Sequence, residues 1–254
     1  MELKDASAYN IQFYKGKPIF IDLLSFKTKK NISPWVAYRQ FCQHFLAPLL
    51  LMSFKEKYLS LLLKNYIDGI PLSITSNLLG IKKFNSKAFF HIYLQNKISQ
   101  KNINNIKSSK NFSKKDFFRI LDNLYDIISN LKIKIKNDNW GNYYEQKILS
   151  DQYLDSKIKL VKDFLSIIKP KYIYDIGANT GIFSKISSEY CKEVISLDSD
   201  IDCTESLYLN IKQNSITNIL PLVVDLANPT PSIGWDNNER DSFLRRMKKD
   251  TILA

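Results

Sequence analysis

Hydrophobic and polar positions follow two different patterns along this chain, and the change between them divides it. Near the start, residues 9–14 and 18–22 are rich in β-forming side chains and flank a glycine, which predicts a hairpin. Further along the first half, apolar residues recur at spacings of three and four, as they do on one face of a helix. This spacing predicts helices over residues 35–46, 54–66, 72–79 and 114–131.

In the second half, short apolar runs alternate with helical periodicity. Strands that alternate with helices predict a parallel sheet with right-handed crossovers. Helices are predicted over residues 151–169, 182–190 and 202–214, and strands over residues 172–176, 194–197 and 219–224.

Composition changes near residues 137–141, and we place a domain boundary there. We expect an α/β protein with two parts. Residues 1–140 are predicted to form a mainly helical N-terminal domain with a short β-hairpin, which would shape a substrate site. Residues 141–254 are predicted to form a Rossmann-like domain.

Composition excludes several classes of protein. With 254 residues, 44% apolar and 24% charged, the chain can bury a sizeable core and is not wholly disordered. The apolar run 45–52 is too short to span a bilayer, and no secretory signal stands at the start, so we expect no membrane association. Three cysteines without a CxxC pair suggest neither disulfides nor a zinc site, and we expect a cytoplasmic location.

The net charge of +12 is unevenly placed. Residues 81–115 hold nine lysines and no acidic residue, whereas residues 172–254 hold 12 acidic and 8 basic side chains. A basic stretch of this kind fits an RNA partner, but it also fits an ordinary solvated surface. Only five of the 37 basic residues are arginine, the residue that grips phosphate through two hydrogen bonds, so the second interpretation is favoured.

The segment with the clearest chemistry is Asp175-Ile-Gly-Ala-Asn-Thr-Gly181, where the first strand of the predicted sheet turns into a helix. Ligands bind at this edge of a parallel sheet, and glycine permits tight turning and close approach of the backbone. The dinucleotide fingerprint fails because Asn179 and Ile182 stand where it needs small residues. A Walker A loop fails because Gly181 is not followed by Lys and Ser or Thr.

Three carboxylates accompany this turn at the ends of successive strands. Asp175 precedes the glycines and would attract an ammonium or sulfonium group while repelling a diphosphate. Asp198 ends the second strand, where a carboxylate accepts hydrogen bonds from ribose hydroxyls. Asp225 follows the third strand and is placed to accept from an adenine amino group. Together they fit S-adenosylmethionine, although for Asp175 taken alone the role of a turn or capping residue is favoured.

Residues 172–225 resemble the first three strands of a class I S-adenosylmethionine-dependent methyltransferase. Over nearly its whole length the chain also resembles a narrower bacterial family, the methyltransferase-like nodulation host-specificity proteins. Beyond the glycine turn, the resembling stretches are Trp35-Val-Ala-Tyr-Arg-Gln-Phe-Cys-Gln-His-Phe-Leu-Ala-Pro48, Asp68-Gly-Ile-Pro-Leu72, Asp225-Leu-Ala-Asn-Pro-Thr-Pro231, Ile233-Gly-Trp235 and Glu239-Arg240.

The resemblance implies a cofactor, S-adenosylmethionine, and a set of residues to bind it. Gly177, Ala178, Asn179 and Gly181 would line its methionine end with Asp175, while Asp198 and Asp225 would hold the ribose and adenine. Trp235, Glu239 and Arg240 are candidates for contact with the acceptor, though a packing tryptophan beside a surface ion pair explains them equally well. No catalytic base, oligomeric state or acceptor follows from the residues, and the family label suggests a sugar or other small-molecule oxygen.

Related proteins continue well beyond residue 245, whereas this chain stops at residues 250–254, which are predicted to begin a fourth strand. Two alternatives to a small-molecule methyltransferase therefore stay open. One is an RNA methyltransferase that uses the lysine-rich stretch. The other is a truncated, non-catalytic fragment or subunit that needs a partner chain.

Overall fold

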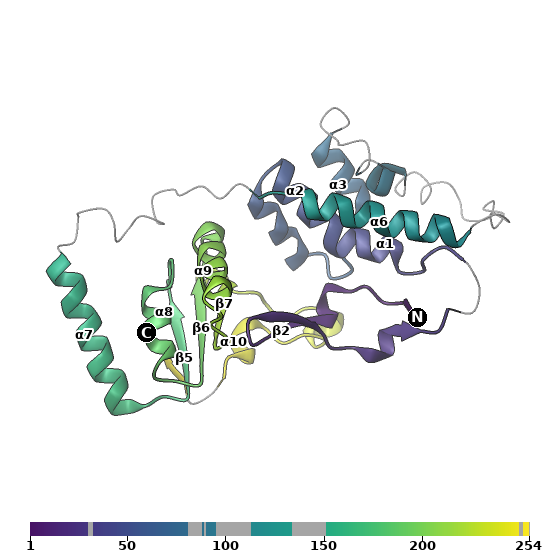
Figure 1. Cartoon of the computed structure of the whole chain (residues 1–254). Coiled ribbons are helices and arrows are strands. Elements are labelled where there is room, and N and C mark those ends of the chain that lie inside the picture. The colour runs from purple at the N-terminus through teal and green to yellow at the C-terminus, as the bar shows by residue number, and fades with distance from the viewer. Residues whose placement is uncertain are drawn as a thin grey trace. The chain divides into compact units, whose positions relative to one another are not determined.

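A computed structural model describes residues 1–29, 33–80, 88, 90–94, 113–133, 151–248 and 251–253. The chain forms two compact units (Figure 1). The first comprises Met1–Gln12 and Phe20–Lys134, and the second comprises Phe13–Ile19 and Ile135–Ala254. The predicted boundary at residues 137–141 and most of the lysine-rich stretch 81–115 lie outside the described residues.

The first unit is mainly helical, with short antiparallel strand pairs near the N-terminus. A buried cluster of leucine and isoleucine side chains, among them Leu46, Leu50 and Ile70, forms its core. Its strands include β1 (Glu2–Leu3) and β4 (Phe26–Lys27), and the hairpin strands β2 (Ile11–Tyr14) and β3 (Lys17–Phe20) are divided between the two units, with Phe13–Ile19 in the second. Its helices are α1 (Tyr38–Phe41), a π-helical turn (Cys42–Leu46), α2 (Ala47–Phe54), a 3-10 helix (Lys57–Lys64), α3 (Leu72–Leu79), a π-helical turn (Phe90–Leu94) and α6 (Lys114–Asn130).

The bounds predicted for the first helix, residues 35–46, were wrong at both ends. It begins at Tyr38 because the segment before it is bound to β1, where the Trp35 indole Nε1 donates to the Leu3 carbonyl at 2.7 Å. It also continues past Pro48 as far as Phe54. The π-helical turn just before Pro48 explains why the helix continues. In this turn the Ala47 amide donates to the Cys42 carbonyl, five residues back instead of four. The wider turn makes room for Pro48, which has no backbone N–H to donate.

The second unit contains a parallel sheet in the order β7-β6-β5-β8, preceded by a long helix (Figure 1). The crossover connections put the earliest of these strands, β5, in the interior, as at the start of a doubly wound sheet. The predicted strands and helices are confirmed to within a few residues. They are α7 (Asp151–Ile168), β5 (Tyr172–Ile176), α8 (Ile182–Ser188), β6 (Glu193–Asp198), α9 (Ile201–Gln213), β7 (Ile219–Val223) and β8 (Thr251–Leu253). The structure also contains α10 (Phe243–Arg246), which was not predicted.

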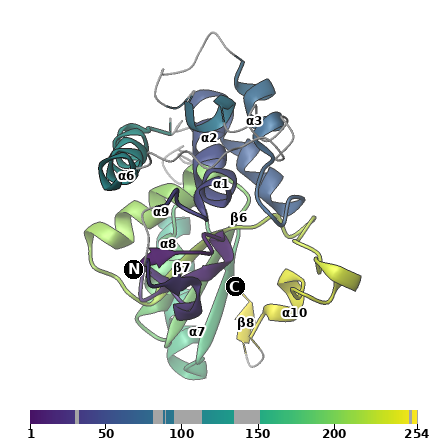
Figure 2. The same ribbon diagram turned by 90° about the vertical axis from the view of Figure 1, so that its right-hand side faces the viewer.

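Successive side chains of a strand point to opposite faces, and each face of this sheet packs against a different helix. On one face, Val194 and Ile219 pack with Leu207 and Ile211 of α9. On the other, buried residues of β5 and β6 pack against Phe243 of α10, which leads toward β8 (Figure 2). Burial on both faces explains why the strands are nearly continuous apolar runs.

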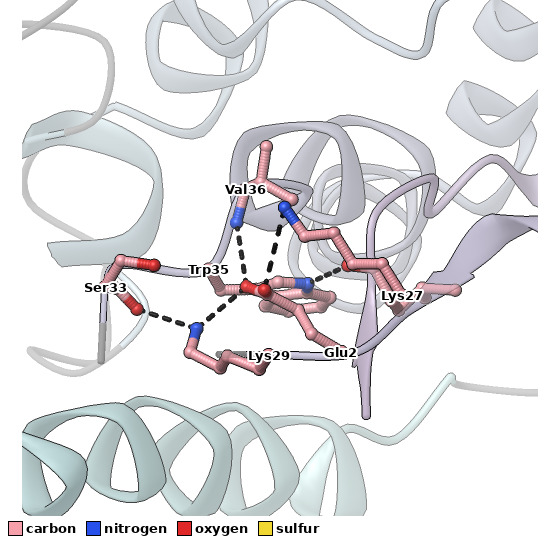
Figure 3. A network of polar contacts seen from close by, with 7 residues as sticks. Glu2, Lys27, Lys29, Ser33, Trp35 and Val36 are labelled. Carbon is pink, nitrogen blue, oxygen red and sulfur yellow. Dashed lines mark hydrogen bonds and ion pairs between the residues drawn. The ribbon is translucent and has the colours of Figure 1, made fainter. Parts of the chain in front are cut away.

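A buried carboxylate joins the N-terminal strand to the segment before α1 (Figure 3). Glu2 is 5% exposed and accepts hydrogen bonds from Lys29 Nζ at 2.9 Å and from the Val36 amide at 3.4 Å. Lys27 Nζ lies 3.8 Å from Glu2 Oε2, and Lys29 Nζ also donates to the Ser33 carbonyl at 2.8 Å. A buried charge is tolerated when it is paired and hydrogen-bonded in this way.

Glu2→Gln should destabilise the first unit by about 1.5–3 kcal/mol at neutral pH, because a charge-assisted bond is lost. Burial alone would raise the pKa of Glu2, but Lys29, the Val36 amide and Lys27 together outweigh it and the pKa lies below its ordinary value of 4.5. A lowered pKa contributes stability above the unfolded value, and that stability is lost as the pH falls through the folded value. Denaturant unfolding should therefore show a lower free energy of unfolding for Glu2→Gln at neutral pH, and the difference from the native chain should disappear in acid. The exposed Glu56→Gln is the control, and an equal deficit for both variants contradicts the assignment.

Candidate functional site

The glycine turn follows directly from β5 and is bound to the neighbouring strand. The amides of Gly177 and Ala178 donate to the Leu197 carbonyl at 2.9 and 3.0 Å, which bends the chain over the end of β6. Gly177 has φ +70°, Asn179 has φ +50° and Gly181 has φ +80°, all in the left-handed region. The sequence thus produces a tight turn at the carboxyl edge of the sheet, as predicted.

The two glycines are needed for different reasons. A Cβ on Gly181 would lie 2.3 Å from Cδ1 of Leu207, so glycine there lets α9 pack against the start of α8. A Cβ on Gly177 would meet nothing within 4 Å, so the space beside that residue is open. Only its positive φ favours glycine within the chain itself. Open space next to a glycine at this edge is where a ligand can approach the backbone.

Asp198 joins the turn to the end of β6. Its Oδ2 accepts from the Asn179 amide at 2.7 Å and its Oδ1 accepts from the Asp200 amide at 2.8 Å. The structure therefore brings Asp198 and the glycine turn together, as predicted. A carboxylate has about four acceptor positions, so these two bonds leave capacity for hydroxyl donors of a ligand.

The Asn179 side chain serves the turn. Its Oδ1 accepts from the Thr180 amide at 2.6 Å, and its own amide is bonded to Asp198. Ala178 is 7% exposed and buried in the turn. Both residues lie in the predicted site, and their contact with a cofactor stays a prediction.

Asp175 points into the layer between sheet and helix. It is 5% exposed, its Oδ2 accepts from Ser184 Oγ at 2.5 Å, and Ser196 Oγ donates to Ser184 Oγ at 2.7 Å. Burial raises the pKa of Asp175, an effect that Ser184 and the charge of Lys157 oppose. The carboxylate thus holds the first turn of α8 against β5. This favours the capping alternative for Asp175, and its contact with a cofactor stays a prediction.

Asp225 is exposed and lies two residues beyond the end of β7. Its Oδ1 accepts from the Ala227 amide at 2.9 Å, which shapes the following loop. The Val224 amide donates to the Asp198 carbonyl at 2.8 Å, so Asp198 and Asp225 follow neighbouring strands at one edge of the sheet. The predicted order of carboxylates is therefore present in space.

The three candidate acceptor residues belong to a loop closed by reciprocal backbone bonds of 3.1 Å between Ile233 and Arg240. Glu239 packs against Gly234, whose φ is +89°. Trp235 is 85% exposed, so its ring covers neither the glycine turn nor the core. Trp235, Glu239 and Arg240 thus share one closed loop, and their contact with an acceptor stays a prediction.

The sequence reasoning missed the hydroxyl pair Ser184 and Ser196, which is completely buried behind Asp175. A signal was present, because Ser196 interrupts the otherwise apolar strand Val194-Ile-Ser-Leu197. It also missed Asp200, whose side chain caps α9 by accepting from the amides of Asp202 and Cys203.

Among the described residues, no cluster of three or more His, Cys, Asp or Glu side chains has a geometry that could hold a metal ion. The helices in the described part of the chain include none that is long and apolar enough to cross a membrane.

Comparison with known proteins places the chain beside a bacterial nodulation protein. It is 34% identical over 261 residues to nodulation protein NoeA of Rhizobium meliloti, covering 99% of this chain and 55% of that protein. This chain is a relative of NoeA. The resemblance to the nodulation proteins that the sequence predicted is confirmed, and the chain spans about half the length of this relative. No family model matches the chain.

Three solved structures are each similar to 26% of the chain. YcgJ of Bacillus subtilis is 20% identical over 28% of its own length, and SMU.1697c of Streptococcus mutans, solved in complex with SAH (S-adenosylhomocysteine), is 24% identical over 39%. An rRNA methylase of Streptococcus thermophilus is 16% identical over 38%. Each has a TM-score of 0.25, too low to bear on the fold or function of this chain.

Gly181→Ala should destabilise the second unit more than Gly177→Ala does. Both variants place alanine at a positive φ, which costs about 1–2 kcal/mol. Only Gly181→Ala also forces a Cβ against Leu207, and such overpacking costs about 1–3 kcal/mol more. Denaturant unfolding of the two variants measures the difference, and equal losses would rule out the close approach.

Asp175→Asn should be at least as stable as the native chain at neutral pH, whereas Asp175→Ala should lose about 1–3 kcal/mol. Asparagine keeps an acceptor for Ser184 without a buried charge, and alanine leaves that hydroxyl unpaired. A raised pKa contributes stability below the unfolded value, and this is lost as the pH rises through the folded value. Any advantage of asparagine in denaturant unfolding should therefore shrink in acid. Equal losses for the two variants would show that the charge itself is required.

Proposed function

We propose that this chain binds S-adenosylmethionine at the glycine turn and belongs to an enzyme that transfers its methyl group. The observation that carries the proposal is Asp198, a carboxylate bonded to the turn amide of Asn179 beside the open side of Gly177. A ribose that approached this edge would find a fixed acceptor for its hydroxyls. The relationship to NoeA adds support through the methyltransferase-like family that the sequence resembles.

Electrostatics also favour this cofactor over a dinucleotide. Asp198 ends β6, Asp225 lies two residues beyond the neighbouring β7, and no basic residue stands in the turn itself. Such a set of carboxylates disfavours a diphosphate and favours a cationic ligand with hydroxyl and amino donors. The bound cofactor would supply an activated methyl group on a sulfonium.

The chain's own residues would then act by positioning. Gly177 leaves room for the ligand, Asp198 holds the ribose and Asp225 accepts from the adenine amino group. Asp175 acts indirectly, because it fixes α8 and with it the turn. Alignment of two reactants accounts for a large part of such a transfer, since the sulfonium already activates the methyl group. For the acceptor we propose a sugar or other small-molecule oxygen.

Calorimetric titration with S-adenosylhomocysteine, with NAD as the control ligand, tests the proposal. We expect saturable binding of the first and none of the second. Asp198→Ala should weaken binding at least tenfold, since a charge-assisted hydrogen bond contributes about 1.5–3 kcal/mol. Asp155→Ala on the exposed side of α7 is the matched control and should bind normally.

Because Asp198 also accepts from Asn179, the variant's unfolding must be measured beside its affinity. A folded Asp198→Ala chain with native affinity sinks the ribose assignment. A folded native chain that binds neither ligand sinks the cofactor proposal for these residues.

A further inference from the structure

Trp235 is the most exposed aromatic side chain among the described residues, with 85% of its surface open to solvent. Tryptophan is usually well buried, because its ring carries a large apolar area. Exposure of this degree excludes a packing role for Trp235 against the described residues. The ring is therefore available to a ligand, and its surroundings decide which kind of ligand it would take.

A closed loop, residues 233–240, carries this tryptophan, and we call it the Trp235 loop. Two backbone bonds join Ile233 to Arg240, and the Asn238 amide donates to the Trp235 carbonyl at 3.0 Å. A short loop that is closed in this way has few conformations open to it. It would therefore lose little conformational freedom when a ligand binds.

The backbone on both sides of Trp235 adopts positive φ angles. Gly234 has φ +89°, and Asp236 and Asn237 have φ +52° and +54°. Positive φ is uncommon for residues other than glycine, although aspartate and asparagine adopt it more often than most. Backbone strain is concentrated at ligand sites and switch regions, where the surrounding structure holds it in place. Here it fixes the direction in which the indole ring leaves the loop.

Further bonds anchor the Trp235 loop to the body of the second unit. The Ser242 amide donates to Ser232 Oγ at 3.0 Å, and the Phe243 amide donates to the Thr230 carbonyl at 2.9 Å. The Phe243 ring is buried in the core beside β5 and β6. A tryptophan on a loop fixed to the core can serve as a platform, whereas one on a loose loop would first have to be ordered.

The polar side chains next to the indole ring are amides and a carboxylate. Asp236, Asn237 and Asn238 are exposed, and Asn238 Nδ2 donates to Asp236 Oδ2 at 3.0 Å. Together they present donors and acceptors of hydrogen bonds, and a hydroxyl group can use both. A neutral pyranose sugar has many hydroxyls and one face of C–H bonds. That face suits the negative π-face of an indole ring.

Charge argues against a nucleic acid as the ligand of this loop. The segment 235–241 contains three carboxylates and one arginine, which are Asp236, Glu239, Asp241 and Arg240. Of the arginines that follow, Arg245 lies 3.9 Å from the Asp241 carboxylate and is paired with it. Aromatic platforms that stack the bases of a single strand lie in a positively charged groove, and this segment has an excess of negative charge instead.

We propose that the Trp235 loop is a binding site for a neutral oligosaccharide. The indole ring of Trp235 stacks on the apolar face of one sugar ring, and Asp236, Asn237 and Asn238 bind its hydroxyls. The loop supplies recognition and no reacting group. In the proposed methyl transfer such a site would hold the acceptor, and in that respect alone it rests on the proposed function.

An array of immobilised neutral oligosaccharides of glucose, galactose, mannose and N-acetylglucosamine tests this site on the 254-residue chain without cofactor. We expect binding to at least one of them. Trp235→Ala should weaken that binding by about tenfold or more, as the loss of an aromatic anchor does. Trp235→Phe, which keeps a smaller platform, should retain more affinity. Tyr125→Ala is the matched control and should bind normally, because Tyr125 is 73% exposed on α6.

Three results would overturn the proposal. These are no binding of any oligosaccharide by the folded chain, native affinity of Trp235→Ala, and binding of single-stranded RNA that falls with salt and is lost in Trp235→Ala. Titration with S-adenosylhomocysteine is measured separately. A chain that binds an oligosaccharide but not this ligand keeps the saccharide site and loses the proposed cofactor site, and the reverse result does the opposite.

Discussion

The second unit depends on one backbone carbonyl, that of Leu197, which accepts from both Gly177 and Ala178. These two bonds turn the chain sharply at the end of β5 and direct it into α8. Because Asp198 follows Leu197 at once, the same arrangement carries its carboxylate to the Asn179 amide. The positive φ of Gly177 and the missing side chain of Gly181 are conditions of this geometry. The direction in which the chain enters α8, the close packing of α8 and α9 and the candidate site all depend on it.

Asp175 stabilises that arrangement from the layer between β5 and α8. Its buried carboxylate, with Ser184 and Ser196, forms a polar chain inside an otherwise apolar layer. Such a chain is costly unless each group is bonded, and here the serine hydroxyls meet that need. The same residue thus has a structural partner and stands next to a site that a ligand could use. Burial raises the pKa of Asp175, while the hydrogen bond from Ser184 keeps its carboxylate paired.

The α/β half was predictable to within a few residues because its signals are local. Short apolar runs that end in Asp198 or precede Gly177 describe a strand and a turn without reference to distant parts of the chain. The start of α1 was not predictable, because it depends on a bond between Trp35 and Leu3, which are brought together by folding. The candidate site was predicted from the order of its carboxylates, whereas the orientation of Asp175 toward Ser184 depends on packing that no spacing reveals.

The π-helical turn Cys42–Leu46 has a consequence for how this family can change length. Each residue of a helix advances its direction by about 100°. A π-helical turn uses one residue more than an α-helical turn for about the same rotation, so the residues after it keep their direction. Loss of one residue from the turn would restore a regular helix, and Leu50 and Leu51, which have no exposed surface, would stay in the core. The same deletion inside α2, which has no wide turn, would rotate the residues after it out of register, so a change of length is tolerated best at Cys42–Leu46.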